Sequence, residues 1–209
     1  MYFHRTPVLL PLLYPSLVWH KDRDQKSIYL TFDDGPVPEA TEFALESLGA
    51  YKALATFFCV GENVYKHPEI FKKIMSFGHS IGNHTYNHLN GWKTKDDTYL
   101  ENVNECLTVM EEHTAPPDSK LFRPPYGRIT RKQIDKVSGQ YDIIMWDVLS
   151  GDFDRKLARE KCLANTIRHT RNGSIVIFHD SYKAYDNLQY VLPRYLDHFA
   201  TKGYLFKAL

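Results

Sequence analysis

The chain has 209 residues, of which 43% are hydrophobic, and its formal net charge is +1. This length and apolar content suit one sizeable core. The mixing of acidic and basic residues excludes the charge pattern of a nucleic-acid-binding protein or a polybasic membrane anchor. The three cysteines are Cys59, Cys106 and Cys162. They contain no CxxC pair and are odd in number, so we expect reduced, buried thiols and no disulfide scaffold.

The N-terminal stretch over residues 8–18 is apolar, but prolines interrupt it. It is shorter than the roughly 20 residues of a membrane-spanning helix, and no small-residue cleavage site follows it. We therefore expect neither a transmembrane segment nor a signal peptide, and hence a cytoplasmic protein. Residues 1–25 are expected to form an extension that packs its leucines, Tyr14 and Trp19 against a single domain formed by residues 26–209.

Strand and helix patterns alternate along the rest of the chain. Apolar, β-branched runs predict strands over residues 28–32, 55–60, 79–83, 120–123, 141–148, 174–178 and 204–208. Helical spacing of apolar residues predicts helices over residues 38–51, 68–77, 97–113, 130–137, 159–170 and 187–202. The alternation predicts an α/β fold with a parallel sheet. Periodicity alone does not decide between a closed barrel and a doubly wound open sheet.

Polar residues follow most of these predicted strands. In chain order they are Asp33 and Asp34, His84 and His88, Arg123 to Tyr126, Asp147 and Asp152, and His179 with Asp180. Barrels and open parallel sheets both build their sites at the C-terminal ends of the strands. We therefore expect these groups to meet at one edge of the sheet.

His84 and His88 are four residues apart, so on a helical turn both imidazoles can reach one ion. With Asp34 they would form a metal site of two histidines and one carboxylate, which leaves positions open for water and substrate. A simpler explanation is a chance pair of histidines on a solvated face. Likewise, Asp33-Asp34-Gly35-Pro36 is also a common turn sequence.

Arg123 precedes a rigid Pro-Pro step and Tyr126. An arginine is always charged, so Arg123 could hold a carboxylate such as Asp33 in place. The Pro-Pro step could aim a backbone N–H at a developing oxyanion, although the same residues could form only a stiff extended loop. His179 would be an exposed imidazole at the same edge.

Five segments together resemble the motif set of the polysaccharide deacetylase family, also known as the NodB-homology or carbohydrate esterase family 4 domain. They are Thr31 to Pro36, His84 to His88, Arg123 to Tyr126, Trp146 to Phe153, and Ile175 to Asp180. The resemblance covers about residues 26–209. It implies a distorted (β/α)7 barrel and a divalent metal that assists removal of acetyl groups from N-acetylglucosamine-type sugars.

The resemblance also implies roles for individual residues. Asp33 would be the general base, and Asp34, His84 and His88 the metal ligands. Arg123 would pair with the base, the Tyr126 N–H would stabilise the oxyanion, and His179 would be the general acid. Where the family often has an Asp-x-x-Asp-Trp run, this chain has Leu149-Ser150-Gly151-Asp152-Phe153. Asp152 would still tune His179, but the departures put the sugar specificity in doubt.

Aromatic and apolar side chains are candidates for substrate contact. Phe153 and Ile177 could surround the acetyl methyl group, while Trp92 and Tyr126 could contact sugar rings. We expect a monomeric enzyme that acts on an acetylated glycan and uses zinc, with cobalt or nickel as alternative ions. The alternatives are a metal-dependent hydrolase of a small amide, cyclic imide or O-acetyl ester, and a non-catalytic carbohydrate-binding protein.

Overall fold

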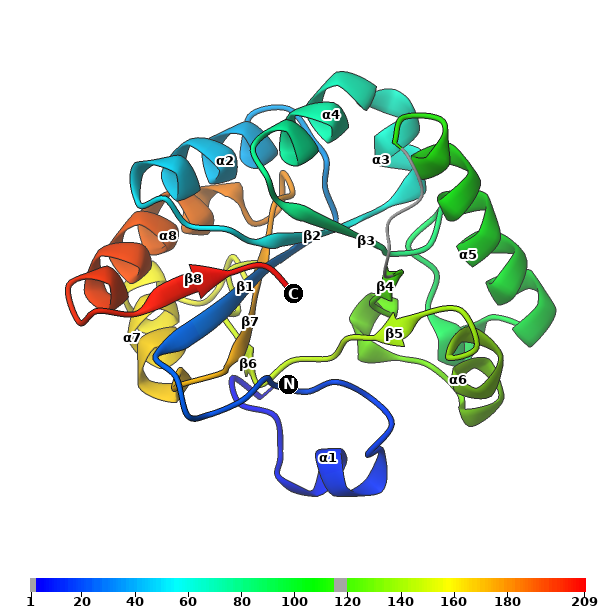
Figure 1. Ribbon diagram of the computed structural model, residues 1–209, viewed down its shortest axis with the longest axis horizontal. Helices are drawn as coiled ribbons and strands as arrows, with labels where there is room; N and C mark the ends of the chain where they lie inside the picture. The colour runs from blue at the N-terminus through cyan, green and yellow to red at the C-terminus, as the bar shows by residue number, and fades with distance from the viewer. Residues whose placement is uncertain (1–2, 115–119) are drawn as a thin grey trace.

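A parallel β-sheet organises the fold (Figure 1). The structure is a computed structural model that describes residues 3–114 and 120–209. In these residues, seven strands follow the order β5-β4-β3-β2-β1-β7-β6, and β8 adds to the sheet by pairing with β1. The strands are β1 (Ser27–Asp33), β2 (Thr56–Cys59), β3 (Ser80–Asn83), β4 (Leu121–Phe122), β5 (Asp142–Ile143), β6 (Val148–Leu149), β7 (Ile175–His179) and β8 (Leu205–Lys207).

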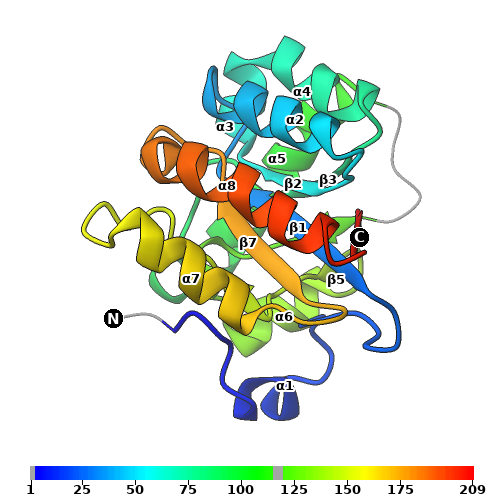
Figure 2. The same ribbon diagram turned by 90° about the vertical axis from the view of Figure 1, so that its left-hand side faces the viewer.

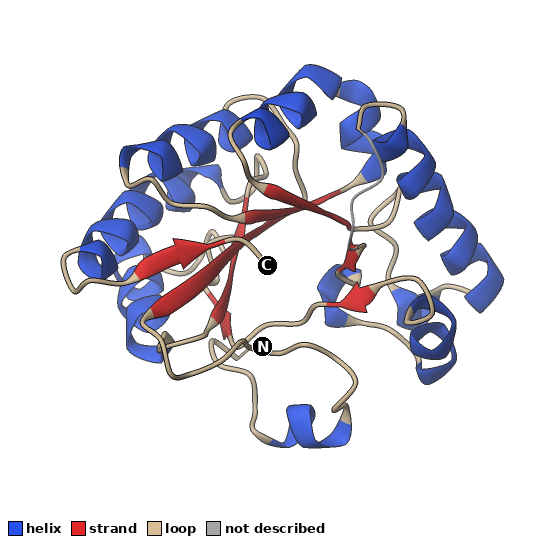
Figure 3. Ribbon diagram, viewed as in Figure 1, coloured by secondary structure: helices blue, strands red, loops and turns tan. Residues whose placement is uncertain are grey.

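Helices cover the outer face of the curled sheet, as Figure 3 shows by colour. They are α2 (Ala40–Ala50), α3 (Gly61–Lys66), α4 (Pro68–Ser76), α5 (Asp96–Glu111), α6 (Arg131–Val137), α7 (Arg159–His169) and α8 (Tyr185–Ala200). Helix α1 (Leu9–Leu13) lies apart from the sheet in the N-terminal extension and has no buried residues (Figure 1). Every pairing along the sheet path is parallel. The sheet curls but does not close between β5 and β6. The expected distorted (β/α)7 barrel is confirmed in this open, half-barrel form.

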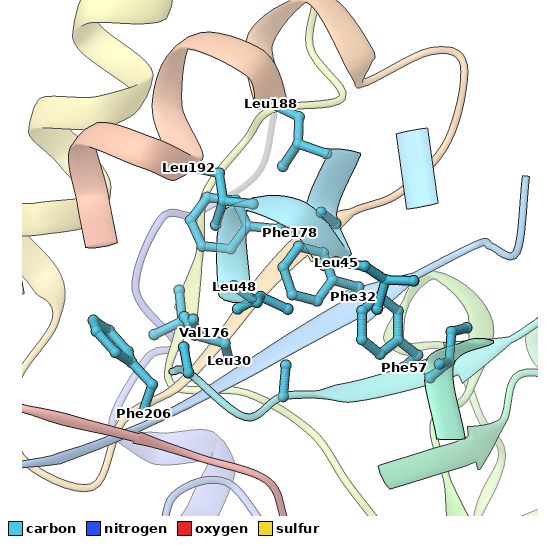
Figure 4. Close-up of a cluster of buried hydrophobic side chains, with 14 of the residues drawn as sticks. Leu30, Phe32, Leu45, Leu48, Phe57, Val176, Phe178, Leu188, Leu192 and Phe206 are labelled. Atoms are coloured by element: carbon cyan, nitrogen blue, oxygen red, sulfur yellow. The ribbon is translucent and has the colours of Figure 1, made fainter. Parts of the chain in front are cut away.

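The central strand β1 shows how the sequence separates core from site. Side chains alternate along a strand, so Leu30 and Phe32 point toward the helices while Thr31 and Asp33 point to the inside of the curl. Phe32 stacks on Phe57 of β2 with ring centroids 4.8 Å apart. Figure 4 shows the cluster that forms around this pair, to which β7 and helices α2 and α8 contribute. Burying each large apolar side chain contributes about 1.5–3 kcal/mol.

The predicted strand over residues 141–148 is wrong as a single element. The structure has two short strands there, β5 and β6, on opposite edges of the open sheet. Between them, the carbonyl groups of Ile144 and Met145 accept hydrogen bonds from the Arg123 side chain. The buried guanidinium thus binds two backbone carbonyl groups that, in a continuous strand, would accept hydrogen bonds from a neighbouring strand. Helix α3, which directly follows Val60, was also not predicted.

The N-terminal extension contacts both edges of the open sheet. Val18 forms a parallel bridge with Ile144, and Arg5 forms an antiparallel bridge with Val148. Leu17 and Trp19 are buried, as expected, and the Trp19 indole donates to the Tyr14 carbonyl. The prediction for the remaining leucines is wrong, because Leu9, Leu10, Leu12 and Leu13 are exposed. Residues 1 and 2 of the extension lie outside the described part of the chain.

Figure 2 shows α7 and α8 side by side, with α1 at the far lower end of the molecule. In the part of the chain that the structure describes, none of the helices has the length and apolar character needed to cross a membrane. The three cysteines are free and buried, as predicted.

Candidate active site

The C-terminal ends of the strands bring most of the predicted polar residues together. Asp33 ends β1 and His179 ends β7, and the two strands pair in register at this point. Asp147 is the exception. Its carboxylate accepts hydrogen bonds from Arg23 at 2.9 Å and from Ser174 at 2.6 Å, at the start of β7. The expectation that Asp147 follows a strand into the site is therefore wrong, since it precedes β6.

Asp34, His84 and His88 form a cluster in which the potential ligand atoms lie within 4.8 Å of one another. The Asp34 Oδ1 atom is 3.8 Å from His84 Nε2 and 3.2 Å from His88 Nε2. Ligands about 2.0–2.1 Å from a tetrahedral zinc ion would be roughly 3.4 Å apart. The cluster therefore fits a divalent ion held by two imidazoles and one carboxylate.

The protonation states of this cluster also suit a metal. His84 Nδ1 lies 2.7 Å from the Arg123 carbonyl oxygen, which can only accept, so Nδ1 carries the proton and Nε2 keeps its lone pair. Burial lowers the pKa of His84 to about 4, so the imidazole is neutral at pH 7. Burial alone would raise the pKa of Asp34, but its hydrogen bond with His88 and the charges of nearby histidines hold that pKa well below its usual range.

Asp180 binds the loop that carries Asp34 through two hydrogen bonds. One carboxylate oxygen of Asp180 accepts from the Gly35 N–H at 3.0 Å, and the other accepts from the Thr41 hydroxyl at 2.7 Å. A side chain at position 35 would collide with the Asp180 carboxylate, which explains the glycine. Burial raises the pKa of Asp180 to about 8. The sequence pattern indicates no separate role for Asp180, although it directly follows His179 in its motif.

Arg123 is fully buried and reaches the base of the site from β4. Its Nη1 atom donates to Asp33 Oδ1 at 2.7 Å and to Thr31 Oγ1 at 2.6 Å. Nε and Nη2 donate to the Ile144 and Met145 carbonyls at 3.1 and 3.0 Å. The predicted pairing of Arg123 with Asp33 is thus present. Thr31 is an additional partner, and the alternation of β1 places its side chain on the same face as Asp33.

His179 and the buried Asp152 form a second pair at this edge. Asp152 accepts from the His179 backbone N–H at 2.8 Å, and its other oxygen lies 2.7 Å from His179 Nδ1. Burial alone would lower the pKa of His179, but the charge and hydrogen bond of Asp152, with smaller contributions from Asp34 and Asp33, raise that pKa to about 9. The imidazole is therefore cationic at pH 7 and can give up a proton.

Of the predicted substrate residues, Phe153 and Ile177 lie beside His179, and Tyr126 lies beside His88. The Phe153 ring meets the His179 ring edge-on at 5.0 Å, and Ile177 lies two residues before His179 on β7, where it is buried. Tyr126 and Trp92 are 61% and 65% exposed. The Trp92 indole donates to the Ile129 carbonyl, and the Arg128 guanidinium lies 5.3 Å from its ring centroid. Tyr126 thus offers an exposed aromatic ring beside His88. Trp92 is exposed too, and its contacts are with Ile129 and Arg128.

Comparison with known proteins places this arrangement in a family. A model of the polysaccharide deacetylases matches residues 20–143, which is more than half of the chain. The chain belongs to the polysaccharide deacetylase family. It is 31% identical over 193 residues to a peptidoglycan-N-acetylglucosamine deacetylase of Bacillus cereus, covering 91% of this chain and 89% of that protein. It is 32% identical over 160 residues to a chitooligosaccharide deacetylase of Azorhizobium caulinodans, covering 76% of this chain and 75% of that protein.

Solved structures of polysaccharide deacetylases agree with the fold. The crystal structure of a peptidoglycan N-acetylglucosamine deacetylase superposes with a TM-score of 0.88 at 28% identity and covers 98% of this chain and 95% of that chain. The peptidoglycan deacetylase PdaC of Bacillus subtilis gives a TM-score of 0.80 at 28% identity, with 90% of each chain covered. The family resemblance that the five motifs predicted is confirmed.

Proposed function

We propose that this enzyme removes N-acetyl groups from an N-acetylglucosamine-containing poly- or oligosaccharide and releases acetate. The observation that carries this proposal is the Asp34–His84–His88 cluster, which lies beside an arginine-bound carboxylate and a carboxylate-bound histidine. Relatives that align with most of this chain deacetylate peptidoglycan or chitooligosaccharides, as their names state.

Asp34, His84 and His88 would hold a divalent ion. When bound, such an ion polarises a carbonyl group and lowers the pKa of water. Zinc suits two imidazoles and one carboxylate, and cobalt or nickel suit the same donors. We propose zinc as the native ion.

Asp33 is the proposed general base. The Arg123 guanidinium binds one of its carboxylate oxygens at 2.7 Å and fixes its orientation at the end of β1. The other carboxylate oxygen remains available to accept a proton from the attacking water. Asp33 is adjacent in sequence to Asp34, so the base and the metal ligand are supplied by one turn of the chain.

His179 is the proposed general acid. Asp152 binds its Nδ1 atom, which leaves Nε2 to donate a proton to the leaving amine. In this proposal the Tyr126 backbone N–H donates to the oxyanion of the tetrahedral intermediate. Tyr126 has a φ of 61°, an unusual conformation for a residue with a side chain, and this turn follows the rigid Pro124-Pro125 step.

Substrate contacts are proposed for the four aromatic and apolar residues predicted from the sequence. Phe153 and Ile177 would surround the acetyl methyl group beside His179. Trp92 and Tyr126 would contact sugar rings, and their exposure favours a glycan over a small amide or ester held in a closed pocket.

The proposal is tested by measuring acetate release from N-acetylglucosamine oligomers. The purified enzyme is stripped with a chelator and then reloaded with zinc or cobalt. We expect release that disappears on stripping and returns with metal. If the reloaded enzyme bound metal but released no acetate from any oligomer, a small amide, cyclic imide or O-acetyl ester would become the better candidate substrate.

A further inference from the structure

The Tyr126 side chain lies against one of the metal-site histidines. Its ring meets the His88 imidazole with centroids 4.6 Å apart and an interplanar angle of 66°. Its phenol oxygen is 3.1 Å from His88 Nδ1. The left-handed turn at Tyr126 continues through Gly127, which also has a positive φ and has no room for a side chain because Trp146 lies there. This turn brings Tyr126 next to His88, and the tyrosine side chain is largely exposed.

The direction of this hydrogen bond follows from the other ring nitrogen. His88 Nε2 faces Asp34 Oδ1 at 3.2 Å and is the atom available to a metal. An imidazole that offers the Nε2 lone pair carries its proton on Nδ1. When a metal ion takes the place of the proton that Nε2 shares with Asp34, Nδ1–H donates and the Tyr126 phenol oxygen accepts.

The two metal-site histidines are thus fixed in the same way by different partners. His84 Nδ1 donates to the Arg123 carbonyl at 2.7 Å, and His88 Nδ1 donates to the Tyr126 phenol at 3.1 Å. Such partners fix the ring orientation and raise the basicity of the ligand, and their loss typically weakens metal binding by about 10- to 100-fold. A carbonyl cannot be removed by a side-chain substitution, whereas the phenol oxygen can.

We propose that the Tyr126 side chain is a positioning residue of the metal centre, which orients His88 and strengthens its bond to the ion. The inference rests on the proposed function in one respect, because it takes Asp34, His84 and His88 as metal ligands. It differs from a role for Tyr126 in sugar stacking, since stacking would leave metal affinity unchanged when no glycan is present.

The test is the affinity of the metal-free protein for Zn²⁺ and Co²⁺, measured by competition with a coloured chelator in the absence of glycan. Tyr126→Phe keeps the ring and the backbone and removes only the phenol oxygen from an exposed side chain. We expect about 10-fold weaker binding or more, together with a changed visible spectrum of bound Co²⁺. Tyr182→Phe is the matched control, because Tyr182 is 59% exposed and follows His179 rather than the metal-site loop. It should bind both ions like the unmodified protein.

His88→Ala distinguishes a failure of the proposed role of Tyr126 from a failure of the metal-site assignment. If His88→Ala loses metal while Tyr126→Phe stays within about twofold of the unmodified protein and keeps its Co²⁺ spectrum, the role of Tyr126 is refuted and the metal site stands. If His88→Ala binds both ions as tightly as the unmodified protein, the metal-site assignment is refuted, and the role of Tyr126 falls with it.

Discussion

Replacing Arg123 with methionine should destabilise the fold strongly. Arg123 is fully buried, and its guanidinium donates to Asp33, Thr31 and two backbone carbonyls. Arg123→Met removes these donors and leaves the Asp33 carboxylate, 5% exposed, without its cation. Removing one partner of a buried ion pair costs about 3–5 kcal/mol. For a chain of this size, that corresponds to a fall in melting temperature of roughly 6–20 °C.

The assay is urea unfolding of Arg123→Met, Asp33→Asn and the double variant. Because the double variant leaves neither charge unpaired, it should be more stable than the sum of the single losses predicts, by about 0.5–3 kcal/mol. Lys73→Met is the matched control. It breaks an ion pair with Glu42 that is similarly short, 2.6 Å against 2.7 Å, but lies on the surface. That loss should be under about 1 kcal/mol. If Arg123→Met lost no more stability than Lys73→Met, the reasoning on burial would be refuted.

Two further predictions concern pH. The pKa of His179 is about 9, so turnover should fall as pH rises through that value and the acid loses its proton. Asp152→Asn removes the negative charge that contributes most to stabilising the protonated His179. The alkaline limb of the kcat/KM profile should therefore move down by about one pH unit or more. An unmoved limb would contradict the role of His179 as the general acid. Burial lowers the pKa of His79 from 6.5 to about 4. Between these pH values the imidazole is protonated in the unfolded chain but stays neutral in the folded protein. Stability should therefore fall as pH drops from 6.5 toward 4, and urea unfolding of His79→Gln should show a smaller loss over this range.

The sequence predicted which polar residues lie together because most of them follow the ends of strands. A parallel sheet brings the C-terminal ends of its strands to one edge, so residues far apart in the chain could be placed together from the strand pattern alone. The pairing of Arg123 with Asp33 follows this logic, whereas the pairing of His179 with Asp152 is implied by the family resemblance. Asp147 does not reach this edge. The predicted strand over residues 141–148 is broken in the structure, and Asp147 lies at the start of β6 instead of at the end of a strand.

The contacts that the sequence did not predict have no local pattern. Asp180 holds the Gly35 N–H and the Thr41 hydroxyl, which are remote from it in the chain. The Tyr126 phenol reaches His88 only because the backbone turns left-handed at that point. Hydrophobicity alone also could not place the leucines of the N-terminal extension. Leu17 finds a buried partner surface and Leu12 does not, although both lie in the same apolar run.

The central claim is that Asp33 moves the proton while Asp34, His84 and His88 hold the metal. The most direct test measures metal content and acetate release from N-acetylglucosamine oligomers on the same preparations of unmodified protein, Asp33→Asn and His84→Ala. Asp33→Asn should keep about one equivalent of metal and lose roughly 10²- to 10⁴-fold in turnover, whereas His84→Ala should lose both metal and activity. A fully active Asp33→Asn enzyme, or a His84→Ala enzyme that keeps its metal and its activity, would contradict the account.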